Sequence, residues 1–398
     1  MCSFGQPRRT PKHASRAVQA VVKTPSTEKP KKAPGSESNF TGLPERKQDI
    51  PITSPTPPNK QMQEHLDLVR SNFQFVFKDI MDLDHFEDNI FFSDPISNFT
   101  FFRGYQFNVQ FLRYFLAPIY EVHEVRQVGE QEILVKWSWT MNFWWNRFNP
   151  LRGLYDPRLC FSGLTVLGYS PKTGKWNKHI DAWDCLKNQQ FPSLEAFAFT
   201  LRQLFQVAKP PNRYTPEFML FKKYKDWEIR RYKPFLIAEV TVEEGGLEAA
   251  DQALRSYLAG SNDRQQVIDR TTPLFRDSGG KASYMLPGNQ VGEHAPAPDD
   301  EAVQVRAHPG GWYAAGICGG SPSETQVQRE VRFIRACANQ EGSRPLDDSW
   351  IFARYNEANW PKGPFRRSDI LVPLDEASID LWRGVDWDYV QQIVAQRV

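Results

Sequence analysis

The most constraining feature of this sequence is an order of elements that occurs twice in its second half. Each occurrence has two strand-like segments, a helix and two further strand-like segments, marked by alternating apolar residues or by helical spacing. The first comprises Trp227–Tyr232, Phe235–Val242, a helix from Leu247, Val267–Phe275 and Ala282–Leu286, and the second comprises Val303–Ala307, Trp312–Ile317, a helix over Ser323–Ala338, Ser349–Tyr355 and Asp369–Pro373. This tandem order predicts an α+β domain over residues 214–374 with two similar halves, each carrying one helix.

The preceding residues predict a separate α+β domain over residues 61–208. Apolar side chains at steps of three and four mark a first helix, a second helix covers Tyr105–Leu116, and a third is expected over Ser193–Val207 with Ser193 as its cap. The first helix carries Met62, Leu66, Val69, Phe73, Val76, Phe77 and Ile80, and the strands between the second and third helices are Tyr120–Val128, Glu132–Phe143, Leu159–Tyr169 and Lys175–Trp183. Helices followed by a long antiparallel meander favour a curved sheet that wraps the helices.

The ends of the chain and its junction differ in composition from the two domains. Residues 1–60 are rich in Pro, Ser, Thr, Lys and Arg and have no acidic residue before Glu28, so we expect them to be disordered. They resemble a plastid transit peptide, although an ordinary basic tail has the same composition. Residues 209–213 predict a short linker that includes two prolines, and residues 375–398 predict a terminal helix that packs on the body.

Charge and cysteine content limit the partners that the chain can have. A net charge of +2 over 398 residues is too small for a general attraction to nucleic acid or to an anionic membrane, so we expect no nucleic-acid partner. The five cysteines have no Cys-x-x-Cys spacing, which argues against a disulfide framework and against a metal site. No apolar run approaches the ~20 residues of a membrane-spanning helix.

Residues along the second module match, in order, the pattern of a known family. They form a strand of the type Tyr-x-x-x-Glu-x-Arg-x-Tyr, a central Thr-Pro turn after a helix, and a late Ala-Arg-Tyr-Asn followed by prolines and arginines. The matching residues are Tyr224, Glu228, Arg230, Tyr232, Thr272, Pro273, Ala353, Arg354, Tyr355, Asn356, Pro361, Pro364 and Arg366. The module resembles the SOUL haem-binding family, which implies a distorted antiparallel β-barrel with two helices and a pseudo-twofold repeat.

The resemblance implies haem or another tetrapyrrole as the ligand. Such a ligand is a flat apolar disc with two propionates, and it needs an apolar groove with cations beside it, for which the planar guanidinium is well suited. Family members bind porphyrin along the first helix and its adjoining loops. We therefore expect the groove to involve Leu254, Arg255, Tyr257, Leu258 and Arg270.

Two departures from the family pattern bear on this expectation. The chain has Val267 and Arg270 where the family commonly has Lys and Met, a change that could alter the choice of ligand or abolish binding. Axial ligation of iron would need a suitable side chain at the groove, and the only histidines of the module are His294 and His308, in or beside a polar loop. A histidine in a surface loop is usually solvated, so we predict no axial ligand from them.

The first module resembles the cone-shaped fold shared by nuclear transport factor 2, scytalone dehydratase and ketosteroid isomerase. More specifically, it is similar to an uncharacterised plant and cyanobacterial version of that fold. The features that carry this resemblance are Phe102 and Gly104 before the helix and a Trp-x-Trp strand with Trp137 and Trp139. With Trp144 and Trp145, these tryptophans would either line a flat ligand pocket or fill the core.

A catalytic interpretation of the first module would need a titratable group inside its pocket. The candidates are His123, on the first meander strand, and His179 with Asp181 and Asp184, on the last. His179 and Asp181 are two residues apart and so share one face of a strand, where the carboxylate could orient the imidazole. We favour a solvated or structural pair, and we predict no catalytic residue.

These patterns together predict a non-catalytic protein that carries or buffers haem or a related tetrapyrrole in the chloroplast, in the stroma or at a plastoglobule or eyespot. No catalytic cofactor is expected, and a plastid protein or a lipid-body surface is a possible partner. Two alternatives stay open. One is a cone-fold enzyme acting on a hydrophobic pigment or lipid, with His123 or His179 as its base, and the other is an interaction scaffold.

Overall fold

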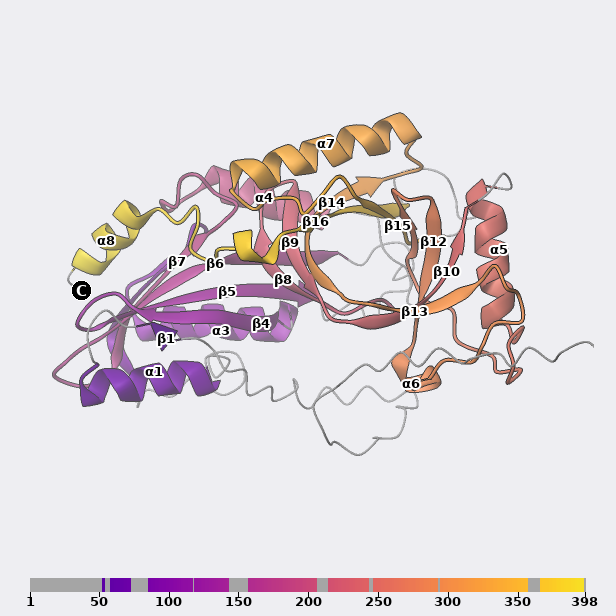
Figure 1. Cartoon of the computed structure of the whole chain (residues 1–398). Coiled ribbons are helices and arrows are strands. Elements are labelled where there is room, and N and C mark those ends of the chain that lie inside the picture. Colours follow the sequence, from indigo (N-terminus) through magenta and orange to yellow (C-terminus); the bar gives the residue numbers. More distant parts are fainter. Residues whose placement is uncertain are drawn as a thin grey trace, which may run out of the picture.

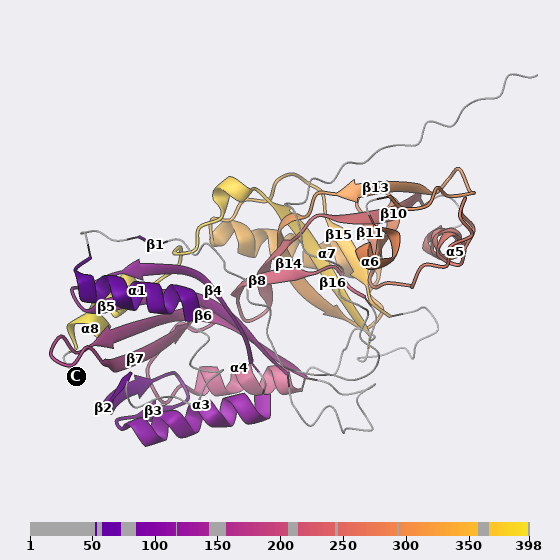
Figure 2. The same ribbon diagram turned by 90° about the horizontal axis from the view of Figure 1, so that it is seen from below.

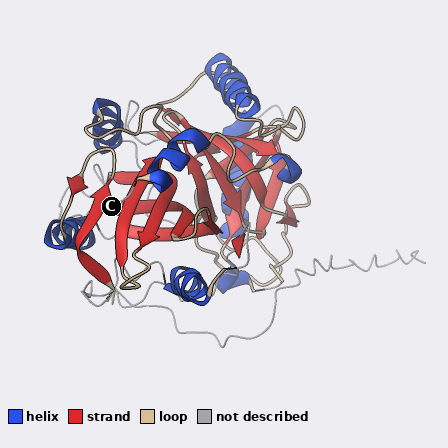
Figure 3. Cartoon of the chain, turned by 90° about the vertical axis from the view of Figure 1, so that its left-hand side faces the viewer, coloured by secondary structure: helices blue, strands red, loops and turns tan. Residues whose placement is uncertain are grey.

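The structure is a computed structural model that describes residues 52–53, 58–72, 85–116, 118–142, 157–205, 214–242, 246–292, 294–356 and 366–396. Two β-sheets dominate it, one in each half of the chain, with helices packed around them (Figures 1 and 3). The predicted α+β architecture is therefore confirmed. The predicted disordered tail up to residue 51, the helical residues 73–80, Trp144, Trp145 and the linker at 209–213 lie outside the described residues.

The first sheet has seven strands in the order β1-β4-β5-β6-β7-β2-β3. Its elements along the chain are β1 (Ile52–Thr53), α1 (Lys60–Asn72), β2 (Phe86–Ser93), β3 (Asn98–Phe99), α3 (Phe102–Leu116), β4 (Pro118–Gln127), β5 (Glu132–Asn142), β6 (Arg158–Tyr169), β7 (Trp176–Trp183) and α4 (Leu194–Leu204). Strands β4 to β7 are the predicted antiparallel meander, and each begins and ends within two residues of its predicted position.

Helices α1, α3 and α4 share one core with the inner face of this sheet, and Figure 2 shows α3 and α4 along that face. The apolar residues Met62, Leu66 and Val69 of α1 are fully buried, as their spacing predicts. Helix α4 begins after Ser193, whose side chain accepts a hydrogen bond from the Ala196 amide and so acts as the predicted cap. The alternation of side chains along β5 turns Trp137 and its inner neighbours towards these helices.

Strands β2 and β3 were not predicted from the sequence. Strand β2 enters between α1 and α3 and pairs in parallel with β7, through Phe92 and His179 among others. Its burial pattern is irregular, and a bulge separates Phe86 from Phe91 in the pairing, so the two-residue alternation that marks a strand is weak here. The helices therefore do not simply precede the strands, because one strand of the same sheet lies between two of them.

The second sheet has nine strands in the order β13-β10-β12-β11-β15-β16-β14-β9-β8. Its elements along the chain are β8 (Phe218–Lys223), β9 (Trp227–Tyr232), β10 (Phe235–Thr241), α5 (Gly246–Leu258), β11 (Leu274–Asp277), β12 (Lys281–Leu286), α6 (Gly288–Val291), β13 (Gln304–His308), β14 (Gly311–Gly319), α7 (Glu324–Gln340), β15 (Ile351–Arg354) and β16 (Arg367–Leu374). Exchanging β9 with β13, β10 with β14, β11 with β15 and β12 with β16 reverses the order of these eight strands. The predicted tandem repeat is thus a pseudo-twofold axis between β11 and β15, with α5 beside one half and α7 beside the other.

Three details of the second domain differ from the sequence expectations. The sheet is a curled half-barrel, because β13 and β8 end the described strand order without pairing to each other. Strands β9 and β10 follow one another in the chain but do not pair, since β9 lies between β14 and β8 while β10 lies between β12 and β13. The predicted strand from Val267 is a loop until Leu274, held by a hydrogen bond from the Ile268 amide to the Leu258 carbonyl of α5.

The C-terminal segment returns from the second domain to the first. After a short 3-10 helix η2 (Glu376–Ser378), the chain reaches α8 (Trp387–Ala395), which Figure 1 shows in yellow beside the strands of the first sheet. Trp382, Val390 and Ile393 are buried against Leu164 and Ile180 on the outer face of that sheet. The sequence predicts a terminal helix that packs on the body, and the structure shows that it packs on the first domain.

Candidate functional site

Helix α5 carries a buried carboxylate that is shared by three arginines. Asp251 is 1% exposed, and Arg255, one turn later, donates to its two oxygens at 2.9 and 2.6 Å. Arg354 of β15 donates to Oδ2 at 3.2 Å, and a guanidinium nitrogen of Arg270 lies 3.8 Å from Oδ1. Tyr284 of β12 donates its hydroxyl proton to the same Oδ1 at 2.7 Å. Asp251 therefore holds three guanidinium groups together beside α5.

This arginine cluster, Arg255, Arg270 and Arg354, has an excess of positive charge. The carboxylates that it meets are Asp251 and the exposed Glu248, which accepts from Arg354 at 2.7 Å, so cations outnumber anions by one. The Arg255 side chain is 39% exposed and that of Arg270 is 24% exposed, so both reach solvent. The cluster can thus receive a further carboxylate from outside without first losing its internal one.

The predicted apolar groove residues lie elsewhere in the geometry. Leu254, Tyr257 and Leu258 are 0%, 1% and 3% exposed, and they pack in the core between α5 and strands β10 and β12. The Tyr257 hydroxyl donates to the Pro296 carbonyl at 2.9 Å. Helical spacing alone indicates such a role, because an apolar stripe on a short helix usually faces its sheet. The structure brings Arg255 and Arg270 together as a pair of cations and places the three apolar residues beneath the helix.

The sequence reasoning missed Asp251, Tyr284 and the role of Arg354 in this cluster. Asp251 precedes Arg255 by four residues on one helix, a spacing that brings the two side chains together, so a local signal for this pair existed. Arg354 and Tyr284 come from strands far away in the sequence, and no local spacing could have revealed their approach.

Neither histidine of the second domain is placed to bind the ligand of such a cluster. His308 stacks on Phe235 at 4.6 Å, and its Nδ1 accepts a hydrogen bond from the Gly310 amide. Burial and the charge of Arg306 lower the pKa of His308 to about 4, so it is neutral and structural. His294 is exposed in its loop. Within the described ranges, no group of three His, Cys, Asp or Glu side chains is arranged to hold a metal ion.

The conserved-looking strand pattern of the second domain builds a buried ion network. Arg230 is 0% exposed and donates to Glu228 at 2.5 Å, to Asp369 at 2.7 Å and to the Tyr232 hydroxyl at 3.1 Å. Burial alone would raise the pKa of Glu228, but the charges of Arg230 and Lys223 hold it well below its usual value. These residues therefore serve the scaffold, and the arginine cluster beside α5 is the separate feature that faces solvent.

The histidine candidates of the first domain lie on opposite faces of its sheet. His179 points inwards, where Nδ1 is 2.8 Å from the Tyr105 hydroxyl and Nε2 is 3.1 Å from Asp181 Oδ1. The pair is buried, so the prediction that it is solvated is wrong. His123 instead packs on Phe221 of the second domain, and burial and the charge of Lys136 lower its pKa to about 3. It cannot serve as a base inside the first domain.

Asp184 and the tryptophans complete the placement of the predicted residues of the first domain. Asp184 follows β7 and accepts from Lys136 at 2.5 Å and from Ser162 at 2.6 Å, on the outer face of the sheet and away from His179. Trp137 and Trp139 are buried in the inner core, with ring centroids 5.6 Å apart. Both therefore act as core residues with one side towards the interior of the domain.

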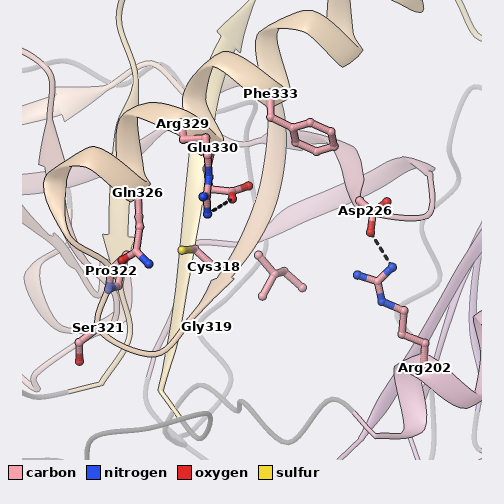
Figure 4. A pocket seen from close by; sticks show the side chains of 11 residues that line it. Arg202, Asp226, Cys318, Gly319, Ser321, Pro322, Gln326, Arg329, Glu330 and Phe333 are labelled. Atoms are coloured by element: carbon pink, nitrogen blue, oxygen red, sulfur yellow. Dashed lines mark ion pairs between the residues drawn. The ribbon is translucent and has the colours of Figure 1, made fainter.

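A pocket of about 640 Å³ lies where α7 faces the first domain (Figure 4). Arg202 of α4 reaches towards it and pairs with Asp226 at 2.6 Å, while Arg329 and Glu330 of α7 approach to 3.7 Å. The Cys318 thiol also lines it, and burial raises the pKa of this thiol, which makes it a poor nucleophile at neutral pH. Both guanidinium groups are already matched by carboxylates, so the lining does not select a class of ligand.

Two family models match the chain, one in each domain. Residues 213–373 match the model described as SOUL heme-binding protein, and residues 63–179 match the model described as Uncharacterized conserved protein (DUF2358). The second domain is therefore a SOUL domain, as its sequence pattern predicts. No curated protein matches the chain.

Solved structures give weaker likenesses. A SnoaL-like polyketide cyclase from Shewanella denitrificans is 12% identical with a TM-score of 0.27, and the match covers 36% of this chain and 96% of that one. A hydrolase from Listeria innocua is 10% identical with a TM-score of 0.29, covering 41% and 94%. An LEH-like epoxide hydrolase from M. tuberculosis is 12% identical with a TM-score of 0.25, covering 36% and 91%. Likenesses at this level assign no activity.

None of the helices in the described ranges is both long and apolar enough to cross a membrane.

Proposed function

We propose that the second domain binds haem or a related tetrapyrrole and that the arginine cluster pairs with its propionates. The observation that carries this proposal is the cluster itself, which lies on helix α5 of a domain that matches a family described as haem-binding. A guanidinium pairs with a carboxylate through two parallel hydrogen bonds, so exposed Arg255 and Arg270 offer one fork to each propionate.

The ring would lie across the exposed side of α5 and not between the helix and the sheet. Ala249 and Ser256 face solvent seven residues apart, and hence on one side of the helix, where short side chains leave a flat surface. Leu254 and Leu258 lie beneath and hold the helix in place. A ring that buries one face in this way binds with modest affinity, which suits a protein that passes its ligand on.

The role that we propose is carriage or buffering of the tetrapyrrole without catalysis, in the plastid stroma or at a plastoglobule or eyespot. The composition of residues 1–60 supports this location, since the segment is basic, hydroxylated and poor in acidic residues. A plastid protein or a lipid-body surface would then be the partner. Fusion of residues 1–60 to a fluorescent protein tests the location, and fluorescence that stays outside plastids would contradict it.

Absorbance titration of the full chain with haemin and with metal-free protoporphyrin tests the binding. We expect both ligands to bind with similar affinity, because ring burial and propionate pairing need no iron ligand. The paired variants Arg255→Gln and Arg270→Gln should each weaken binding about tenfold, the loss expected for one charge-assisted hydrogen-bonded pair. Arg329→Gln is the matched control, because Arg329 is a surface arginine on α7, the pseudo-twofold counterpart of α5.

Two results would overturn the proposal. One is a haemin spectrum that does not change on adding the protein. The other is equal weakening by Arg255→Gln and by the Arg329→Gln control, since that would place the ligand away from α5.

A further inference from the structure

A chain of polar side chains crosses the interior of the first domain. The indole Nε1 of Trp137 donates to Thr165 Oγ1 at 2.7 Å, and the Thr165 hydroxyl donates to Asp181 Oδ1. The same oxygen is 3.1 Å from His179 Nε2, and His179 Nδ1 is 2.8 Å from the Tyr105 hydroxyl. The chain joins β5, β6, β7 and α3, and Tyr105 and His179 are 1% and 7% exposed.

The partners in this chain fix where its protons lie. A carboxylate can only accept, so Nε2 of His179 carries the proton that faces Asp181. Nδ1 is then unprotonated and accepts the Tyr105 hydroxyl proton, because burial and the charge of Asp181 raise the pKa of Tyr105 and keep its hydroxyl protonated. His179 is therefore a neutral base oriented by a carboxylate, an arrangement that can take up one proton and return it.

A second carboxyl group lies within the field of the first. Asp94 follows β2, and its Oδ1 accepts from the Ile96 and Ser97 amides at 2.7 and 2.5 Å. Burial and the charge of Asp181 raise the pKa of Asp94 to about 7. Two carboxyl groups that cannot both ionise readily hold a proton between them near neutral pH. A purely structural network would gain nothing from the second acid.

Two buried donors nearby have no partner in the described part of the chain. Trp183, 3% exposed, has its ring 4.6 Å from that of Phe161, and its indole Nε1 makes no hydrogen bond. Gln203 of α4, 7% exposed, accepts from the Cys160 amide at 2.8 Å through Oε1, but its Nε2 donates to nothing. A buried donor without a partner costs about 1–3 kcal/mol. Both groups can recover this by donating to an oxygen of a bound molecule.

The strand geometry places these features along one wall. His179, Asp181 and Trp183 alternate on β7 and therefore face the same interior, with successive members separated by about 7 Å at the usual rise of a strand. The rings of Phe161 and Phe199 line the same interior, 5.8 Å apart. A small molecule that spans Asp181 and Trp183 would meet a proton-exchanging group at one end and an unpaired donor at the other.

We infer that the interior of the first domain is a binding and proton-transfer site for a small aromatic or otherwise apolar molecule with a hydroxyl or carbonyl oxygen. The rings hold its apolar part, and the Trp183 and Gln203 N–H groups donate to its oxygen. When the molecule carries an acidic hydroxyl, that O–H bond breaks, its proton goes to a carboxylate of the Asp94 and Asp181 pair, and the anion stays on the ligand oxygen. The proton returns by the reverse step, so no oxidant or cofactor is needed.

The probe for this site is 4-nitrophenol, whose absorbance separates the neutral from the ionised form. Nitrobenzene, which lacks the hydroxyl, is the control ligand. We expect the full chain to bind 4-nitrophenol as its anion and to bind nitrobenzene at least about tenfold more weakly, since nitrobenzene cannot use the donors or give up a proton. Failure of 4-nitrophenol to bind, or equal binding of the two, would overturn the inference.

The residue assignment has a matched pair of variants. Trp183→Phe removes only the unpaired N–H and keeps the ring, and it should weaken 4-nitrophenol binding about tenfold. Trp312→Phe removes an equally unpaired indole N–H from the second domain and should leave this affinity unchanged. Asp94→Asn should abolish the change in binding with pH near neutrality, whereas a structural role for Asp94 would change only thermal stability.

This inference is independent of tetrapyrrole binding. Trp183→Phe should leave the haemin titration unchanged, and Arg255→Gln should leave 4-nitrophenol binding unchanged. If Trp183→Phe and Trp312→Phe have the same effect on 4-nitrophenol, the ligand does not meet Trp183 and the site is wrong.

Discussion

The Ser138 hydroxyl of the first sheet donates a hydrogen bond of 2.6 Å to the backbone carbonyl of Leu220 in the second domain. A second bond runs the other way, from the Lys223 amide of β8 to the Ser162 hydroxyl oxygen at 2.6 Å. Ser138 and Ser162 are each 1% exposed. Strand β8 thus belongs to the second sheet by its pairing but is fastened to the outer face of the first, so the two domains share a buried polar interface.

We expect the two domains to unfold together because of this interface. Urea unfolding followed by tryptophan fluorescence and by far-ultraviolet circular dichroism should give one shared transition. Ser138→Ala should lower the free energy of unfolding by about 1–3 kcal/mol, because it leaves a buried carbonyl without a donor. Thr140→Ala on the same strand is the control, since Thr140 makes only a long contact of 3.8 Å with the Cys160 sulfur. Two separate transitions would show that the domains are independent.

Asp184 is expected to be among the most sensitive positions at the interface. Burial alone would raise the pKa of its carboxyl, but the charges of Lys136 and Lys222 keep it below its usual value. Asp184→Asn would leave Lys136, which is 0% exposed, without its counter-ion and should cost about 3–5 kcal/mol in urea unfolding. Adding Lys136→Met should restore part of this loss. A double variant no more stable than Asp184→Asn alone would contradict the pairing.

Lys222 predicts a pH dependence of stability. Burial lowers the pKa of Lys222 from 10.5 to about 8, and its Nζ donates to the Arg383 carbonyl at 2.5 Å. Between these two pKa values the unfolded chain holds a proton that the folded chain has released, so stability rises with pH across this window. The wild type should therefore gain free energy of unfolding relative to Lys222→Met from pH 8 to pH 10. A constant difference over that range would mean that Lys222 stays charged in the folded protein.

The C-terminal segment is expected to stabilise the first domain. The Trp382 indole donates to Glu124 Oε2 at 2.6 Å, and the Arg126 guanidinium lies 4.4 Å from the centre of its ring. Trp382→Phe keeps the ring but leaves a buried carboxylate oxygen without its donor, which should cost about 1–3 kcal/mol. Ile393→Ala removes a side chain that is 2% exposed and should cost about 2–5 kcal/mol. Gln391→Ala, on the exposed side of α8, is the control for both in thermal unfolding.

Local patterns were sufficient to predict most elements of the fold. The alternation along β4 to β7, the Ser193 cap and the spacing of Met62, Leu66 and Val69 each depend on residues close in the sequence. The tandem order of the second domain also predicted its pseudo-twofold sheet. Strand β2 could not be predicted in this way, because its place beside β7 is decided by the interior of the first domain and not by its own weak alternation.

The candidate sites were predictable only in part. A period of two placed His179 and Asp181 on one face, but Tyr105 and Asp94 approach them from α3 and from the loop after β2, and that approach depends on packing. Arg255 and Arg270 were singled out correctly as neighbours, whereas the carboxylate that joins them was not recognised. Leu254 was placed in a groove although its helical spacing is typical of a core position, so in that case a usable signal was given the wrong meaning.

The return of the C-terminal segment has a consequence for synthesis on the ribosome. Leu164 and Ile180 emerge early, yet Trp382 and Ile393, which cover them, follow only after the whole second domain has been translated. For that interval an apolar sheet face of the nascent first domain stays open to water, and a chaperone or the ribosome surface would have to shield it. Moving this segment to another chain should therefore let it act in trans as a folding cofactor for its own first domain.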